Sequence, residues 1–287
     1  MAEASQEQIH RDRVVHQNPY RHVTGDGEFQ APLPEGHPAV DVPLHLNSAQ
    51  LRGGKSLDAE FSREEIEEIA RKLQNKLWKN RNEIWEEDVP EDPIGVLDPS
   101  LALEVVGYVC VRANSLGRID DGNGGLKVAA TIEDQRHRVE ISDDFPVEVL
   151  RFTTAHELGH ALLHEANGLH RDRPVKKALS NDNRDQKEVE ADKFATFFLM
   201  PAKRVKKHFA NRFGKGLLQL DQNTAYGLQP GTDGKLLSES ESLRKFARVV
   251  AKSDRYHDDH FYSLSERFGV SVETMAIRLE ELDLVRL

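Results

Sequence analysis

The segment from His156 to His160 constrains the fold of this chain more than any other stretch of its sequence. It places two histidines four residues apart, and residues with that spacing project from the same face of an α-helix. The flanking side chains are mostly apolar or small: Phe152, Ala155, Leu158, Gly159, Leu162 and Leu163. A helix that is apolar on most sides belongs in a protein core. The sequence therefore predicts a buried helix from Arg151 to Glu165 that carries two imidazoles side by side.

Two imidazoles one helical turn apart can each offer a ring nitrogen to the same metal ion. Glu157 follows the first histidine, which places a carboxylate beside such a metal, in the general-base role that this spacing serves in metalloproteases. The motif fixes only three residues in a chain with 13 histidines, and the alternative is a core helix with two hydrogen-bonded histidines. The apolar context favours a metal site formed by His156 and His160, with Glu157 as catalytic base.

A catalytic zinc site needs a third protein ligand and an open position for water. The segment Gln186 to Pro201 begins with acids, continues as an apolar helix and ends at a proline. Glu188 and Asp192 are four apart in it and share a face, so Glu188 can bind the metal while Asp192 accepts a hydrogen bond from a ligand histidine. Glu190 is the competing ligand, but it lies about 200° around the helix from Glu188. We therefore prefer Glu188.

His164 adds a third histidine one turn further along the same helix. Three ligands on one straight helix cannot surround a tetrahedral metal, and residues 161–163 between His160 and His164 include no glycine to break the helix. We therefore interpret His164 as a structural or rim histidine. A peptidase would also need a donor that stabilises the oxyanion, and His164, His208 and Tyr226 remain unranked candidates.

The segments Arg151 to His164, Glu188 to Ala195 and Leu199 to Pro201 together resemble the ImmA/IrrE family of zinc metallopeptidases. The similarity runs from about Phe61 to Pro201. The resemblance implies an intracellular, gluzincin-like protease that regulates genes by cutting a helix-turn-helix repressor. It also implies that His156, His160 and Glu188 bind zinc and that Glu157 is the base.

The expected fold class is α+β, with a zincin-like core in which a small antiparallel or mixed sheet packs on the two motif helices. Ser62 to Glu65 reads as a capping box that opens a helix through Trp78. The remaining predicted elements are a helix over 101–106 and strands over 108–111, 126–132 and 138–141. By the resemblance, the third strand is an edge on which an extended substrate can add as a further strand.

Four regions follow from composition along the chain. Residues 1–56 are polar and dotted with proline and glycine, which predicts a mostly disordered extension. Residues 57–213 form the predicted metallopeptidase domain, and the glycine-rich and serine-rich residues 214–242 a loop or insertion. Residues 243–287 form a helical C-terminal module.

This C-terminal module resembles a helix-turn-helix, with Gly269 in the turn and Ser271 capping the second helix. A helix that reads DNA would carry basic or amide side chains, but this helix carries Glu273, Glu280 and Glu281. We therefore favour packing on the protease or holding of a protein substrate over direct nucleic-acid binding.

The net charge of −10 argues against a surface that coats DNA broadly, and the basic run Lys203 to His208 is better interpreted as the solvated face of a helix. A single cysteine excludes a disulfide framework and a thiolate zinc cluster within the chain. No apolar stretch approaches 18 residues and no leader precedes the domain, so we expect a cytoplasmic protein without a membrane partner.

These observations predict a zinc-dependent endopeptidase that hydrolyses a peptide bond in a protein substrate, a repressor by the resemblance. Manganese or iron could occupy the same ligands. The alternative is a non-hydrolytic regulator that binds metal, DNA or protein. A hydrolase acting on another bond is a third reading, because the site alone does not name the bond that it cleaves.

Overall fold

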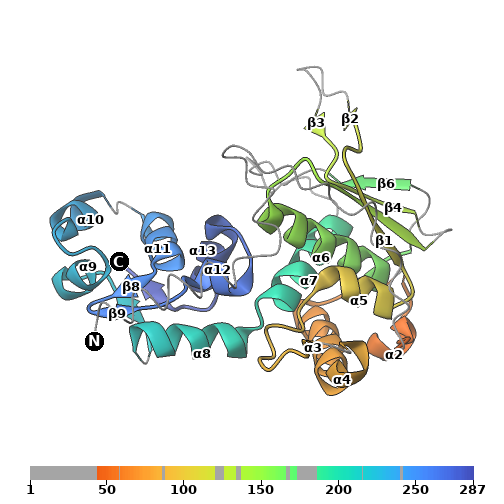
Figure 1. Cartoon of the computed structure of the whole chain (residues 1–287), viewed down its shortest axis with the longest axis horizontal. Coiled ribbons are helices and arrows are strands. Elements are labelled where there is room, and N and C mark those ends of the chain that lie inside the picture. The colour runs from red at the N-terminus through yellow and green to blue at the C-terminus, as the bar shows by residue number, and fades with distance from the viewer. Residues whose placement is uncertain are drawn as a thin grey trace. The chain divides into compact units, whose positions relative to one another are not determined.

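The computed structural model describes residues 44–57, 59–85, 88–119, 126–133, 137–165, 169–172, 186–214, 216–239 and 242–287. These residues fall into two compact units that divide between Leu199 and Met200. Figure 1 shows the labelled helices and strands, coloured from the N-terminus to the C-terminus.

The larger unit combines helices with a small sheet, which is the α+β class expected from the sequence. Its helices are α2 (Ser48–Leu51), α3 (Arg63–Lys79), α4 (Arg81–Ile84), α5 (Pro99–Val105), α6 (Val147–Leu163) and α7 (Gln186–Leu199). Its strands are β1 (Val109–Ala113), β2 (Arg118–Ile119), β3 (Leu126–Lys127), β4 (Ala130–Glu133), β5 (Arg138–Ser142) and β6 (Leu169–Asp172). The strand expected over 126–132 is thus divided, because β3 pairs with β2 in a separate ribbon.

The main sheet is mixed and has the order β1-β5-β4-β6. Strand β5 runs parallel to β1 and antiparallel to β4, and β4 runs antiparallel to β6. The expectation that the strand before the motif helix is an edge is therefore wrong, since β5 has a partner on each side. Its alternating side chains, with Val139 and Ile141 buried, reveal one covered face but not the number of neighbouring strands. The edges in the described residues are β1 and β6.

Helix α3 begins at the expected capping box, in which the side chain of Ser62 accepts from Glu65 N and the Glu65 carboxylate accepts from Ser62 N. One face of α3 is buried, and α3 packs against α7. The amide Nε2 of Gln74 donates to the carbonyls of Phe197 and Phe198, at 2.9 and 3.0 Å. These carbonyls lie in the last turn of α7, where a helix leaves its carbonyls open to donors from outside the helix. Helix α3 therefore fixes the end of α7 as well as its side.

Residues 44–56 of the N-terminal extension are packed onto the larger unit. Leu46 N donates to Val105 O at 2.8 Å, and the guanidinium of Arg52 donates to Leu162 O at 2.9 Å, near the end of α6. Leu51 in α2 is buried. Packed structure therefore begins before residue 57, and the rest of the expected extension, residues 1–43, lies outside the described residues.

Half-buried Glu104 in α5 gives the larger unit a pH-dependent stability. Burial, with a smaller contribution from the charge of Asp98, raises the pKa of Glu104 to about 7. The folded state then holds the proton more tightly than the unfolded state, so this group's contribution falls as pH rises from about 4.5 to 7. We expect Glu104→Gln to raise the melting temperature at pH 8 and to leave it unchanged at pH 4.5. After solvent screening we expect a gain of about 1 kcal/mol at the higher pH.

Thermal melts at both pH values check this expectation, with Glu67→Gln on an exposed position of α3 as the matched control. An equal shift for Glu104→Gln at pH 4.5 and pH 8 would contradict the assigned cause.

The smaller unit is helical, with short strand pairs between the helices. Its helices are α8 (Ala202–Phe213), α9 (Gln222–Leu228), α10 (Asp233–Glu239), α11 (Leu243–Lys252), α12 (Leu264–Phe268) and α13 (Val272–Glu281). Its strands are β7 (Leu218–Gln219), β8 (Arg255–Tyr256), β9 (Asp259–His260) and β10 (Val285–Arg286), of which β7 pairs with β10 and β8 with β9.

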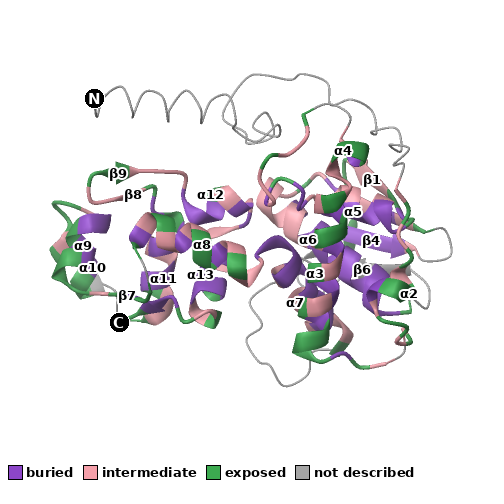
Figure 2. Cartoon of the chain, turned by 90° about the horizontal axis from the view of Figure 1, so that it is seen from below, coloured by how far each residue is buried: buried purple, intermediate pink, exposed green. Residues whose placement is uncertain are grey.

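Helix α8 belongs to this smaller unit. Its buried side chains include Phe213, whose ring meets those of Tyr256 and Phe261 edge to face, at 5.5 and 5.7 Å. Its opposite face is exposed and includes Lys203 and Lys206, as expected for a solvated basic face (Figure 2).

Residues 214–242 were expected to form a loop or insertion, but α9 and α10 lie there. Asp221 caps α9 by accepting from Thr224 N at 2.7 Å, and Leu228 and Leu236 are buried. Of the glycine and serine residues that indicated a loop, Gly214, Gly216 and Gly231 lie outside the helices, whereas Gly227, Gly234 and Ser238 lie within α9 and α10.

Helices α12 and α13 are joined by a turn at Gly269, which has the left-handed backbone conformation φ 61°, and Ser271 caps α13. Two acids of α13 face α11: Glu273 pairs with both Arg244 and Arg248, and Glu280 pairs with Arg244. Hydrogen bonds from Arg248 and then Arg244 lower the pKa of Glu273. The acids therefore hold α13 to α11.

Arg278 in α13 is also buried, and its guanidinium donates to Met200 O at 3.1 Å and to Glu281 at 2.9 Å. This side chain ties α13 to the chain segment that precedes α8.

Candidate metal centre

The two histidines of the motif lie on the buried stretch of α6, as the sequence predicts. Their rings meet edge to face with centroids 4.7 Å apart, and the two Nε2 atoms are 2.9 Å apart. Both side chains are buried. The sequence produces this arrangement because Ala155, Leu158 and Leu162 bury the remaining sides of the helix.

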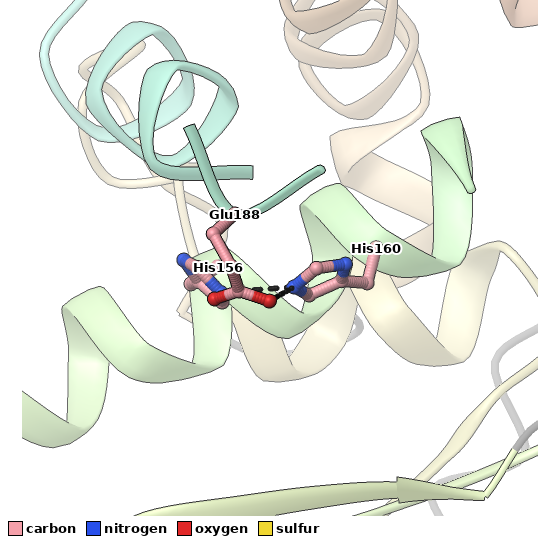
Figure 3. Close-up of side chains that lie close together, drawn as sticks. All are labelled: His156, His160 and Glu188. Carbon is pink, nitrogen blue, oxygen red and sulfur yellow. Dashed lines mark hydrogen bonds and ion pairs between the residues drawn. The ribbon is translucent and has the colours of Figure 1, made fainter. Parts of the chain in front are cut away.

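Helix α7 brings Glu188 to the same point. One carboxylate oxygen of Glu188 lies 3.4 Å from Nε2 of His156, and the other lies 3.4 Å from Nε2 of His160 (Figure 3). One ligand atom from each of the three residues lies within 4.8 Å of the others. Two nitrogens and one carboxylate are the ligand set of a catalytic zinc site that keeps a fourth position open.

A bound metal ion fixes the distances between its ligand atoms. Ligands at zinc-bond lengths in a tetrahedron lie roughly 3.3 Å from one another. Both histidine-to-glutamate distances match that value, and the 2.9 Å between the two histidines is somewhat shorter. Small movements of the rings would complete the site, so these three residues fit a metal.

Asp192 lies one turn after Glu188 and contacts the far side of the first histidine. Its Oδ1 atom is 2.8 Å from Nδ1 of His156. With Nε2 facing the metal position, Nδ1 carries the hydrogen and donates a hydrogen bond to the Asp192 carboxylate. The structure thus brings Asp192 to the position that the sequence argument gave it.

Glu190, the competing acid, points elsewhere. It is only 2% exposed, and its Oε2 atom lies 3.1 Å from Nε2 of His164. Nδ1 of His164 lies 3.0 Å from Nδ1 of His160. His164 is thus buried and in contact with both His160 and Glu190, and burial lowers its pKa to about 4. Sequence reasoning noted both residues but not their contact, although the histidine spacing signalled that His164 lies one turn from His160.

The carboxyl group of Glu157 is fully buried in the middle of α6. It directly follows His156 in the chain, as the motif requires. Of the oxyanion candidates, His164 is engaged with His160 and Glu190.

The other two oxyanion candidates belong to the smaller unit. The ring of His208 packs edge to face on Phe268, and Tyr226 is exposed.

The two motif helices pack unusually closely at Gly159. A Cβ atom at this position would lie 3.0 Å from Ala191 Cα and 3.1 Å from Ala191 O. Helix α7 can therefore approach α6 only because Gly159 has no side chain. This contact lies between the histidines of α6 and beside the acids of α7.

Residues 119–221 match the family model of the IrrE N-terminal-like domain, peptidase M78. The chain carries an IrrE-like domain. The match includes α6 and α7 with all three candidate ligands, and it confirms the resemblance to the ImmA/IrrE family. The IrrE-like domain points to a peptidase-type activity, and His156, His160 and Glu188 form a group that could hold its metal.

Searches of curated proteins and of solved structures gave no significant match to this chain. Among the described helices, each is too short or too polar to cross a membrane.

Proposed function

We propose that this chain is a zinc-dependent endopeptidase with a zincin-like core. The observation that carries the proposal is that His156 and His160 of α6 and Glu188 of α7 converge on one point. Glu157, which follows His156 in α6, adds a fully buried carboxyl group. A structural zinc site would close its fourth position with another protein ligand and would not need Glu157. The non-hydrolytic regulator is therefore the weaker proposal.

In the proposed mechanism, a bound zinc ion would supply a Lewis acid that polarises the scissile carbonyl and lowers the pKa of water. His156 and His160 would hold it through Nε2, and Glu188 through its carboxylate. Glu157 accepts the proton of the attacking water and passes it to the leaving amine. Asp192 holds the ring of His156 in the tautomer that leaves Nε2 free for the metal.

A protein substrate follows from the peptidase-type domain, and a helix-turn-helix repressor is the substrate that the ImmA/IrrE resemblance suggests. Such a substrate would place the enzyme in the cytoplasm. Because β5 is paired on both sides, an extended substrate would have to add at β1 or β6 instead. The smaller unit would hold the substrate rather than read DNA, since the acids of its helix α13 are paired with arginines.

The first test is the metal content of the purified protein beside a Glu188→Ala variant, measured by elemental analysis. We expect about one equivalent of zinc in the wild-type protein, and most of it lost in the variant, because removal of one of three ligands leaves an incomplete site. Glu64→Ala, at an exposed glutamate of α3, is the matched control and should keep its metal. Manganese or iron in place of zinc would be seen directly in the same measurement.

Equal metal content in the wild type and Glu188→Ala would contradict the three-ligand site. No metal in either protein, even after reconstitution with zinc, would favour the regulator.

A further inference from the structure

We propose that His164 and Glu190 form a relay that orients His160 and fixes its tautomer. This inference rests on the proposed metal site and adds to it a positioning role for two residues that do not touch the metal position. The relay consists of two contacts in series. Nδ1 of His160 lies 3.0 Å from Nδ1 of His164, and Nε2 of His164 lies 3.1 Å from Oε2 of Glu190.

Only one placement of the ring hydrogens along the row formed by His160, His164 and Glu190 lets His160 bind a metal. Its Nε2 atom faces Glu188 and must offer a lone pair, so its Nδ1 atom carries the hydrogen. His164 must then accept at Nδ1, which leaves the hydrogen of its neutral ring on Nε2. That hydrogen points to Glu190, and an ionised carboxylate can only accept. Every contact in the row is thus satisfied when His160 is in its metal-binding tautomer.

The surroundings of Glu190 hold this order in place. Its other oxygen, Oε1, accepts from the side-chain amide of Gln186 at 2.9 Å and from Phe61 N at 3.3 Å. Both of these neighbours and His164 present donors, and the carboxylate is almost completely buried. Because the Glu190 carboxylate can only accept hydrogen bonds and donors surround it, it sets the direction of the hydrogen bonds that run from His160 through His164.

The relay also explains why α7 carries three acids in its first two turns. Glu188 faces both histidines, and Asp192 contacts the outer nitrogen of His156 directly. The outer nitrogen of His160 instead contacts His164, and His164 connects it to Glu190. Each ligand histidine is therefore linked to a carboxylate of α7, one directly and one through a second imidazole. Partners of this kind commonly change metal affinity 10- to 100-fold when they are removed.

A matched pair of substitutions at His164 isolates the contact with His160. In His164→Asn, the amide oxygen lies one bond beyond Cγ, as Nδ1 does, and can still accept from His160. His164→Leu has a similar shape without an acceptor, and both variants lose the contact with Glu190. Zinc affinity of the metal-free protein would be measured by competition with a chromophoric chelator, and site geometry by the visible spectrum of the cobalt-substituted protein.

We expect His164→Leu to lower zinc affinity roughly 10- to 100-fold and to alter the cobalt spectrum, with His164→Asn closer to the wild type. Leu163→Ala, at the neighbouring buried residue, is the control for general destabilisation and should keep its zinc affinity. Wild-type affinity in His164→Leu would overturn the relay, and equal losses in the Leu and Asn variants would overturn the role of the acceptor that His164 presents to His160.

Glu190→Gln tests the far end of the relay. One end of an amide is a donor, so it must face a donor in this environment, and we expect weaker zinc binding. Unchanged affinity would overturn the role of Glu190.

Nitrogen NMR of the zinc-loaded wild type tests the proton order without any substitution. We expect His160 with its hydrogen on Nδ1 and His164 with its hydrogen on Nε2, and His164 protonated on Nδ1 would overturn the relay. These results are separable from the proposed function: a wild type that binds zinc while the variants do likewise overturns only the relay. A wild type that binds no zinc overturns both.

Discussion

Replacement of Glu157 by glutamine is expected to reduce peptide hydrolysis about 10²- to 10⁴-fold while zinc stays bound. The amide has nearly the shape of the carboxylate, so the buried position in α6 should remain filled. It cannot take a proton from water at neutral pH, and that step is the one that the proposed mechanism assigns to this residue. The three ligands are unchanged, so metal content should be unaffected.

The measurement is single-turnover cleavage of a protein substrate, with zinc content determined on the same samples. Glu157→Asp is the matched variant, because it keeps an ionisable carboxyl group but withdraws it by one methylene. We expect its activity to lie between those of the wild type and Glu157→Gln. Full activity in Glu157→Gln would sink the proposed mechanism even if zinc binding were confirmed.

Gly159→Ala is expected to destabilise the larger unit and weaken metal binding, although helix propensity alone predicts the opposite. Alanine in a helix interior is favoured over glycine by about 1 kcal/mol. The added Cβ, however, would lie 3.0 Å from a backbone atom of Ala191, and backbone cannot move aside as a flexible side chain can. Overpacking of this kind costs about 1–3 kcal/mol. Packing should therefore outweigh propensity.

The same substitution should reach the metal centre because Glu188 lies less than one turn from Ala191 in α7. Separation of α6 and α7 would move Glu188 away from His156 and His160. We expect a lower melting temperature and a lower zinc affinity for Gly159→Ala. Gly234 offers the control. It lies in α10 with no atom within 4 Å of an added Cβ, so Gly234→Ala should be neutral or stabilising. A Gly159→Ala protein as stable as the wild type would contradict the close contact.

The elements that the sequence predicted best are those with strong local signals. Helix α3 begins at its capping box, and α6 and α7 cover the apolar stretches that contain the motifs. The three converging residues could also be predicted from the sequence, because an i, i+4 spacing fixes a shared helix face without knowledge of the tertiary structure.

Features that depend on partners distant in sequence were missed. The order of the sheet is one example, since nothing within residues 138–142 shows that β5 has neighbours on both sides. The contact between His164 and Glu190 is another, because the two residues are 26 positions apart and on different helices. The helices over 222–239 were overlooked for the opposite reason, since short helices between glycines carry a weak periodic signal.

The pairing between α11 and α13 limits how this module can change by mutation. A path toward a DNA-reading helix would exchange Glu273 and Glu280 for basic or amide residues. In this protein each exchange would set a new side chain against Arg244 or Arg248 and release the arginine that now binds the acid. The helix would gain a charge suited to phosphate only by losing its attachment to its neighbour. A nucleic-acid-binding descendant would therefore need compensating changes in α11 first, and that dependence favours retention of the acids in α13.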